Sequence, residues 1–270
     1  MPELPEVETS RRGISPYVVG NEVSKVTIRQ RQLRWPISAA ISRELPGQTI
    51  DTLERRAKYL LFKTATGTML LHLGMSGRLC IVKHGTPATT HDHVDIEFAN
   101  GLLLRFNDAR RFGSLLWARD PTKHRLLCNL GPEPLSGDFD GAYLWQRARG
   151  RKVAIKQFIM NANIVVGVGN IYASESLFRA GIDPRRQAQR VSRVRADRLA
   201  ATIKEVLAEA IQAGGTTLRD FLGSDGEPGY FQQDLCVYDR EDSPCRECRA
   251  PIRRIVQGQR ATYFCRRCQR

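Results

Sequence analysis

The first residues of the chain place a potential amine nucleophile beside carboxylates that could move protons. The sequence begins Met-Pro-Glu-Leu-Pro-Glu, so removal of Met1 would leave the secondary amine of Pro2 at the new N-terminus. An α-amino group titrates near about 8, against about 10.4 for a lysine, so part of it is uncharged and nucleophilic at neutral pH. Glu3 lies next to this amine as a candidate proton donor.

A purely structural interpretation of the same residues is also available. Pro5 suits the first turn of a helix, and Glu6 and Glu8 suit its positive end. Gly13 is then expected to stop this helix. The octapeptide alone does not choose between a short capped helix and a catalytic N-terminus.

Four cysteines near the C-terminus have the spacing of a metal site. The pattern is Cys245-x2-Cys248-x16-Cys265-x2-Cys268. Two tight turns that each present two thiolates suit tetrahedral zinc, and four protein ligands leave no open position for catalysis. We therefore predict a structural zinc that holds a two-stranded ribbon, whose arms carry Arg253, Arg254 and Arg260. The remaining cysteines lack partners at ligand spacing and are interpreted as ordinary small apolar residues, namely Cys80, Cys128 and Cys236.

A glycine-containing turn precedes another predicted helix. Gly167 and Gly169 come just before Asn170 in the run Val-Gly-Val-Gly-Asn-Ile-Tyr. Free backbone N–H groups at a helix start attract anions, and glycine permits close approach of a phosphate. The third glycine and the preceding strand of a dinucleotide fingerprint are missing, so a phosphate-binding turn is the chemical possibility here.

Two glycine-punctuated loops contain large side chains. Met75 lies in Leu-Gly-Met-Ser-Gly, and Arg110 and Phe112 lie in Arg-Arg-Phe-Gly. Apolar side chains that enter DNA can unstack and kink it, although core packing is the alternative interpretation, above all for Met75. Lys58 precedes an apolar strand, and its pattern alone indicates a strand-end lysine in a basic cluster.

Composition limits the class of partner. The chain has 270 residues, 42 Lys and Arg against 28 Asp and Glu, a net charge of +14 and a pI near 9.9. This excess favours a polyanion, and no apolar run approaches the roughly 18 residues of a spanning helix, so nucleic acid is favoured over a membrane. The N-terminus has no apolar signal-peptide core, and seven cysteines do not suggest a disulfide framework, so we expect a cytoplasmic protein.

The elements that must position these residues follow two different periodicities. From Asn21 to about Trp117 short β-prone runs alternate with turns, and Asn100-Gly101 is a hairpin signal. This pattern predicts a sandwich of two sheets with the N-terminal helix against it. A Pro/Gly-rich stretch around residues 130–134 marks a domain boundary.

Beyond that boundary the periodicity is helical. Residues 199–211 carry apolar side chains at three- and four-residue spacing after Ser192 and before Gly214, which predicts one amphipathic helix. Shorter helices are expected at 140–148 and 153–160. Residues 141–200 contain twelve Lys or Arg against three Asp or Glu, which predicts a basic surface. The predicted fold class is α+β.

The motifs occur in an order that resembles bacterial formamidopyrimidine-DNA glycosylases over essentially the whole chain. They are MPELPEVET, AKYLL, HLGMSG, HDHVD, RRFG, LGPEPL, VVGVGNIYASE, GGTTL, SDGEPGYF and the four cysteines. The resemblance implies a catalytic β-sandwich domain over residues 1–130, a helix–two-turn–helix domain over 131–235 and a zinc ribbon over 236–270. It also implies excision of oxidised purines such as 8-oxoguanine from duplex DNA, followed by β- and δ-elimination at the abasic site.

The resemblance assigns roles to individual residues. It implies four catalytic residues, namely Pro2, Glu3, Lys58 and Arg260. It implies DNA contacts by His72, Met75, His91, Arg110, Phe112, Arg151, Asn170 and Tyr238. It places around the lesion Glu6, Thr216, Thr217 and Tyr230, of which the last three belong to a loop that would close over the flipped base.

Three alternatives remain at this stage. The related endonuclease VIII type shares the proline, the helices and the ribbon but prefers oxidised pyrimidines, although Leu4 and the full GGTTL to PGYF loop favour the purine enzyme. A second alternative is a non-catalytic zinc-ribbon DNA-binding protein, and a third is a vertebrate-like relative. The preferred interpretation is a monomer that acts on oxidised purines opposite cytosine, with one structural zinc and no organic cofactor.

Overall fold

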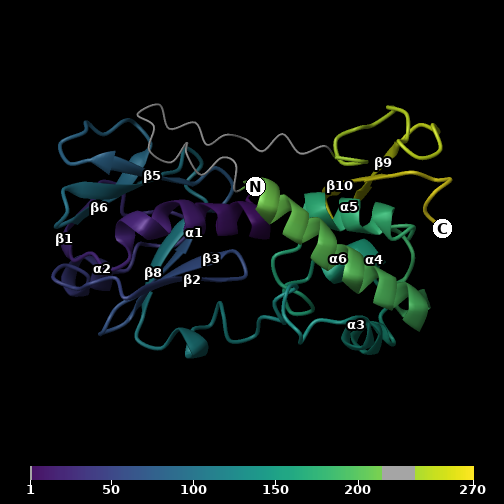
Figure 1. Cartoon of the computed structure of the whole chain (residues 1–270), viewed down its shortest axis with the longest axis horizontal. Helices are drawn as coiled ribbons and strands as arrows, with labels where there is room; N and C mark the ends of the chain where they lie inside the picture. Colours follow the sequence, from purple (N-terminus) through teal and green to yellow (C-terminus); the bar gives the residue numbers. More distant parts are fainter. Residues whose placement is uncertain (1, 215–234) are drawn as a thin grey trace. The chain divides into compact units, whose positions relative to one another are not determined.

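A long helix and two antiparallel sheets dominate the first part of the computed structural model, and helices and a small ribbon make up the second (Figure 1). The structure describes residues 2–214 and 235–270. The chain divides into two compact units. The first holds the residues up to Cys128 together with the last residues of helix α6 (Arg193–Gly214), from Ile211 on, and the second begins at Asn129. The three-part division predicted from the sequence stays a prediction.

The N-terminal helix α1 runs from Leu4 to Val18. The prediction that Gly13 ends it is wrong, because the helix continues through Gly13 and Pro16. Ile14 and Val18 are fully buried in the core of the first unit, so tertiary packing outweighs the weak helix propensity of glycine. Pro16 lies in the last turn, where it cannot donate the backbone hydrogen bond to the residue four positions before it.

The predicted two-sheet sandwich is confirmed. One sheet has the strand order β1-β6-β7-β5, with bounds Val23–Ile28, Asp92–Phe98, Leu102–Asn107 and Arg78–Lys83. The other has the order β2-β3-β4-β8, with bounds Thr52–Arg56, Tyr59–Lys63, Thr68–His72 and Ser114–Ala118. The short helices α2 (Ala39–Glu44) and η1 (Pro121–Lys123) complete the unit.

Side chains from both sheets and from α1 share one apolar core. Leu60 and Leu71 of one sheet, Ile96 and Leu104 of the other, and Val7 of α1 belong to the same buried cluster. The hairpin signal at Asn100-Gly101 is confirmed, since β6 and β7 pair antiparallel on either side of it. Gly101 has φ +80°, a value that favours glycine. Helix α1 contacts β2, β3 and β5, so the N-terminus is held on the sandwich.

The second unit is helical, as predicted. Its elements are α3 (Gly141–Ala148), α4 (Ile155–Ile159), α5 (Asn170–Arg179), η2 (Ala188–Arg190) and helix α6 (Arg193–Gly214) as far as Ala210. The apolar face predicted for α6 is buried, with Leu199, Ile203 and Leu207 fully inaccessible. Asp140 caps α3 by accepting from the Tyr143 N–H. None of the described helices is long and apolar enough to cross a membrane.

A two-stranded ribbon completes the second unit. Strand β9 (Arg253–Gln257) pairs antiparallel with β10 (Arg260–Phe264) through a two-residue turn at Gly258 and Gln259. Both turn residues have positive φ, as a type I′ hairpin requires. The predicted ribbon is therefore present, and β10 contacts α5.

Candidate active site and nucleic-acid interface

The N-terminal residues are held by a reciprocal cap on α1. Pro2 is half-buried, and Glu3 is the N-cap residue and only 2% exposed. The Glu3 N–H donates to Glu6 Oε2 at 2.8 Å, and the Glu3 side chain caps the Glu6 backbone in return. Glu6 thus fixes the peptide that directly follows Pro2. The cap that the structural interpretation predicted is the same feature that orients the candidate nucleophile.

An ion-pair chain joins α1 to the turn that carries Lys58. The Glu8 carboxylate lies 2.8 Å from Arg11 and 3.1 Å from the Nε of Arg55, whose Nη1 donates to the Ala57 carbonyl at 2.9 Å. Burial raises the pKa of Glu8, but the hydrogen bonds and charges of its arginine partners outweigh this and lower it overall. Glu8 is therefore ionised at neutral pH and acts as a link between elements.

Lys58 occupies the two-residue turn between β2 and β3. Ala57, the first turn residue, has φ 55°, in the left-handed region that a two-residue hairpin demands. Tyr59 begins β3 and pairs with His72 at the end of β4, with ring centroids 4.8 Å apart. The turn and the end of β4 therefore bring Lys58 and His72 into one region of the first unit.

His72 is held in its neutral form. Its Nδ1 accepts the Gly74 N–H at 2.9 Å, which leaves the proton on Nε2. Burial lowers the pKa of His72 to about 4, and the charges of Lys58 and Arg34 add to this effect. The ring can thus offer an Nε2–H donor at neutral pH without carrying a charge.

The two loops with large side chains lie at adjoining strand ends. Met75 follows β4 and is 38% exposed, while Phe112 precedes β8 and is 42% exposed; β4 and β8 pair with His72 opposite Ser114. The Arg110 guanidinium lies 4.9 Å from the centroid of the Phe112 ring. The alternative of core packing for Met75 does not hold, because Met75 is 38% exposed and does not belong to the apolar core of the first unit.

His91 is exposed and directly precedes β6. Its carbonyl accepts the Asp108 N–H at 3.0 Å, and its ring centroid lies 6.5 Å from that of buried His93. Sequence reasoning missed Asp108 and Ser76, which hold the two loops. In the sequence, an acid shortly before Arg-Arg-Phe-Gly cannot be distinguished from a surface residue, because only the fold shows that Asp108 is buried.

Asn170 is the first residue of α5, as the glycine turn predicted. Gly169 is the N-cap, and the Asn170 Oδ1 accepts from the ammonium of Lys156 at 2.7 Å. Lys156 is 1% exposed and also donates to Thr262 Oγ1 at 2.8 Å and to the Ala261 carbonyl at 3.0 Å. This lysine, which sequence reasoning missed, ties the glycine turn to the ribbon.

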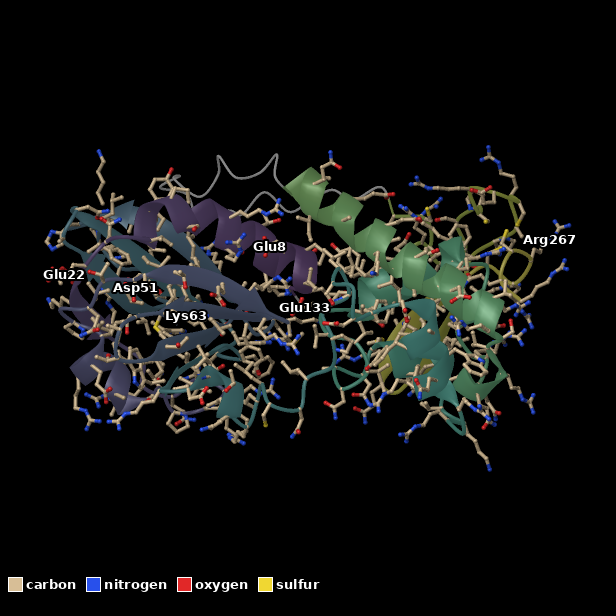
Figure 2. All side chains as sticks on the ribbon, turned by 60° about the horizontal axis from the view of Figure 1, so that its bottom comes forward. Glu8, Glu22, Asp51, Lys63, Glu133 and Arg267 are labelled. Atoms are coloured by element: carbon tan, nitrogen blue, oxygen red, sulfur yellow. The ribbon has the colours of Figure 1, made fainter. Side chains whose placement is uncertain are left out.

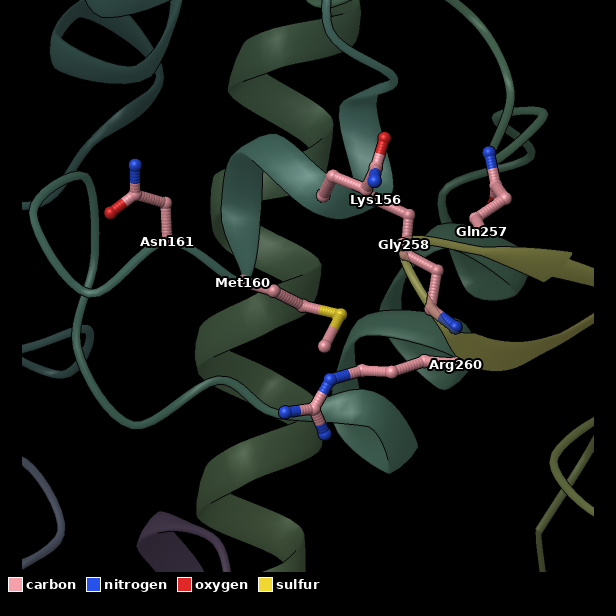
Figure 3. Close-up of a pocket in the computed structure, with 7 residues that line it drawn as sticks. Lys156, Met160, Asn161, Gln257, Gly258 and Arg260 are labelled. Carbon is pink, nitrogen blue, oxygen red and sulfur yellow. The ribbon is translucent and has the colours of Figure 1, made fainter.

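Arg260 begins β10 and lines a pocket of about 200 Å³. Figure 3 shows its guanidinium and the Met160 side chain extending into the same region from the ribbon and from the end of α4. Gly258 lies against Gln157, so that a side chain at this position would meet the Gln157 amide at 2.5 Å. Gly258 has φ +54°, a conformation that favours glycine, whereas the Gln157 amide could move aside for a small side chain.

A buried carboxylate anchors the segment that contains Tyr238. Glu175 of α5 is 3% exposed and accepts the backbone N–H groups of Cys236, Val237 and Tyr238 at 2.8, 2.9 and 2.8 Å. The Tyr238 ring lies 5.2 Å from that of Tyr263 in β10. Glu175 was missed because an acid in the run Ala-Ser-Glu-Ser looks like any exposed helical residue.

The four predicted zinc ligands form a cluster. Their sulfur atoms all lie within 4.8 Å of one another, with Cys245–Cys268 at 3.8 Å and Cys248–Cys265 at 3.4 Å. Tetrahedral zinc with Zn–S bonds of about 2.3 Å separates its sulfurs by about 3.8 Å, so these residues fit the ion. Of the three other cysteines, Cys128 is exposed and not packed as an apolar residue would be.

The surface of the second unit is rich in cations. Arg151 is exposed after α3, and Arg253, Arg254 and Arg260 are exposed on the ribbon. Figure 2 shows many nitrogen-tipped side chains around this unit, with Arg267 on its ribbon segment. Thr216, Thr217 and Tyr230 lie outside the described residues.

The predicted residues thus form two groups, one on each unit. The first unit holds Pro2, Glu3, Glu6, Lys58, His72, Met75, His91, Arg110 and Phe112, and the second holds Arg151, Asn170, Tyr238, Arg260 and the cysteine cluster. Exposed cationic residues and a four-thiolate ribbon define the class as a zinc-ribbon protein that binds DNA.

Comparison with known proteins gives the family. Residues 1–115 match the formamidopyrimidine-DNA glycosylase N-terminal domain, residues 130–222 match its H2TH domain, and residues 242–270 match the zinc finger found in this enzyme and in isoleucyl-tRNA synthetase. The formamidopyrimidine-DNA glycosylase of Pseudomonas entomophila is 58% identical over 270 residues, which is 100% of both chains. The chain belongs to the formamidopyrimidine-DNA glycosylase family.

Solved structures agree with this assignment. A mutant Lactococcus lactis enzyme in complex with DNA containing Fapy-dG has a TM-score of 0.90, 31% identity and coverage of 99% of both chains. The wild-type enzyme of the same organism, in complex with DNA containing an oxidised pyrimidine, has a TM-score of 0.89, 32% identity and the same coverage.

Proposed function

We propose that the protein is a bifunctional DNA-repair enzyme that excises oxidised purines from duplex DNA and then cleaves the abasic site. The observation that carries this proposal is the N-terminus, where Pro2 precedes a helix whose cap holds Glu3 and Glu6 in a fixed arrangement. The Glu8–Arg55 ion pair also ties this helix to the turn that carries Lys58. Family membership supports the glycosylase activity.

The chemistry starts from the free amine of Pro2. Its nitrogen attacks C1′ of the damaged nucleotide and loses its proton, while the glycosidic bond breaks with its electron pair on the base, which takes up a proton. The C1′–N bond formed then becomes an iminium as the C1′–O4′ bond opens and O4′ takes a proton from Glu3. Glu6 orients the peptide and does not need to exchange a proton.

The iminium draws electrons from the sugar and makes elimination possible. Loss of the C2′ proton gives an enamine, which expels the 3′ phosphate by β-elimination. Loss of the C4′ proton then expels the 5′ phosphate by δ-elimination, so the product is a one-nucleotide gap. Lys58 and Arg260 stabilise the departing phosphates, and His72, Asn170 and Tyr238 hold the backbone.

The side chains of Met75, Arg110 and Phe112, here called the wedge, and the zinc ribbon prepare the DNA for excision. Met75, Arg110 and Phe112 fill the space left when the damaged nucleotide is turned out of the helix, since excision requires access to C1′. His91 and Arg151 add contacts to DNA. Zinc holds the ribbon that carries Arg260, and Thr216, Thr217 and Tyr230 remain predicted contacts to the flipped base.

Substrate range is the finer part of the proposal. Leu4 and the GGTTL to PGYF segment favour oxidised purines over the pyrimidines preferred by the endonuclease VIII type. A Lactococcus lactis relative has been crystallised in complex with DNA that contains an oxidised pyrimidine, so binding of such DNA is expected in addition. We further propose that the protein acts as a monomer on the chromosome in the bacterial cytoplasm.

Borohydride trapping tests the proposal. The reagent reduces the iminium to a stable amine, so protein with a free Pro2 is expected to become covalently linked to duplex DNA containing 8-oxoguanine opposite cytosine. Intact mass establishes whether Met1 has been removed. Selective acetylation of Pro2 should abolish trapping and leave binding largely intact, because the phosphate contacts lie elsewhere. Processed protein that never cross-links would overturn the lyase mechanism, and equal loss of binding would make Pro2 a binding residue.

A further inference from the structure

Asp108, directly after β7, is completely buried between the two loops that carry the wedge. Its Oδ1 accepts the Ser76 hydroxyl at 2.6 Å and the Arg110 N–H at 3.3 Å, and its Oδ2 accepts the Gly113 N–H at 2.7 Å. Ser76 Oγ in turn accepts the Arg110 N–H at 3.1 Å. One carboxylate therefore joins the neighbour of Met75 to residues on both sides of Phe112.

The backbone of Asp108 is held as firmly as its side chain. Its N–H donates to the His91 carbonyl at 3.0 Å, and its carbonyl lies 2.8 Å from the Nε2 of buried His93. The same carbonyl accepts the Arg111 N–H at 3.2 Å. A third segment, that of His91, thus meets the two wedge loops at Asp108.

The loops also interlock through glycines. A side chain at Gly74 would collide with the backbone of Phe112 and Gly113, and one at Gly113 would lie 3.0 Å from Asp108 Oδ2. Arg111, between the two wedge residues, has φ 56°, which is uncommon for a non-glycine residue. Such a conformation persists where the surrounding contacts impose it, and the contacts of Asp108 lie on both sides of it.

We propose that Asp108 is the positioning residue of the wedge: its carboxylate fixes Met75, Arg110 and Phe112 in the arrangement that displaces a base from the duplex. This inference rests on the proposed function. Unstacking a base step costs free energy, so a loop that shifts when it enters the duplex would displace the base less effectively. Asp108 itself is buried and does not touch the substrate.

The three donors around Asp108 require a side chain that only accepts hydrogen bonds. The two carboxylate oxygens of Asp108 accept from all three donors, whereas an amide of the same shape turns an NH2 group toward either Ser76 and Arg110 or Gly113. The isosteric change Asp108→Asn therefore leaves at least one loop N–H facing another donor. Ser76→Ala removes the hydroxyl and keeps the carboxylate, so it tests the same link without changing the charge.

The experiment compares excision from a stacked duplex with chemistry at a site that needs no base displacement. Single-turnover release of 8-oxoguanine opposite cytosine is measured beside borohydride trapping on DNA with a preformed abasic site. A 2-aminopurine next to the lesion reports unstacking by its fluorescence. Asp120→Asn, at an exposed cap in the same unit, is the matched control, and thermal unfolding checks the fold of each variant.

Asp108→Asn is expected to slow excision about 10- to 100-fold and to reduce the 2-aminopurine signal, while abasic-site trapping changes less than about 3-fold. Ser76→Ala is expected to show the same pattern more weakly, and it decides the matter if Asp108→Asn does not fold. Wild-type excision and fluorescence in the variants would overturn the proposal, as would equal loss of trapping. Failure of the wild-type protein to excise or trap would instead overturn the proposed function.

Discussion

The Arg110 guanidinium stacks over the ring of Phe112, 4.9 Å from its centroid, in a loop whose middle residue has positive φ. A guanidinium that stacks on an aromatic face directs its N–H groups outward in its own plane, where they can donate to the edge of a base. The pair therefore combines a wedge with a planar donor group in one loop.

Arg110→Ala should narrow the preference for cytosine opposite the lesion. The unpaired cytosine offers two adjacent acceptors, O2 and N3, whereas adenine offers N1 beside its N6 donor. Opposite adenine, one N–H of Arg110 would face the N6 donor, at a cost of roughly 1–3 kcal/mol, or about ten- to a hundredfold in discrimination between the two bases. Single-turnover excision opposite each base measures the ratio, with exposed Arg119→Ala as the control. An unchanged ratio would assign the discrimination to another residue.

His72 should make the first unit less stable as the pH falls from about 6.5 toward 4. The pKa of His72 is about 4 when folded, and a free histidine titrates near about 6.5, so the unfolded chain binds more protons in this window. The loss is about 1–3 kcal/mol after solvent screening. Urea unfolding of wild type and His72→Gln at pH 7 and pH 4.5 should show a smaller pH dependence in the variant. Equal dependence would mean that His72 is not held neutral.

Glu175→Gln should loosen the start of the ribbon. The carboxylate accepts three backbone N–H groups, and a glutamine would turn its NH2 group toward at least one of them. We expect a loss of about 1–3 kcal/mol in unfolding free energy and faster removal of zinc by a chelator. Glu209→Gln, at an exposed ion pair with Arg179, is the control. Zinc release at the wild-type rate would show that this anchor does not support the ribbon.

Cys248→Ser should release zinc and weaken DNA binding. Zinc binding contributes folding energy to a small ribbon, and loss of the ribbon displaces Arg260. Metal content and binding to abasic-site DNA measure the effect, while exposed Cys128→Ser, outside the cluster, should retain both. A zinc-free variant that binds and cleaves normally would give the ribbon another role.

Local chemistry allowed the sequence alone to determine several features. Two Cys-x2-Cys pairs can hold zinc because each pair closes within a few residues, and the four sulfurs do lie together. The apolar spacing along α6 and the Asn100-Gly101 turn depend on neighbours in the chain, so they too could be predicted. The N-terminal Pro2 and its acids were visible for the same reason.

Tertiary structure decided which residues hold these groups in place. Gly13 does not end α1 because the sandwich buries Ile14 and Val18, which no local rule registers. Asp108, Lys156 and Glu175 look like ordinary charged residues in the sequence, yet each is almost fully buried and bonded to segments far along the chain. Their role depends on desolvation and on long-range partners, and only the folded chain supplies both.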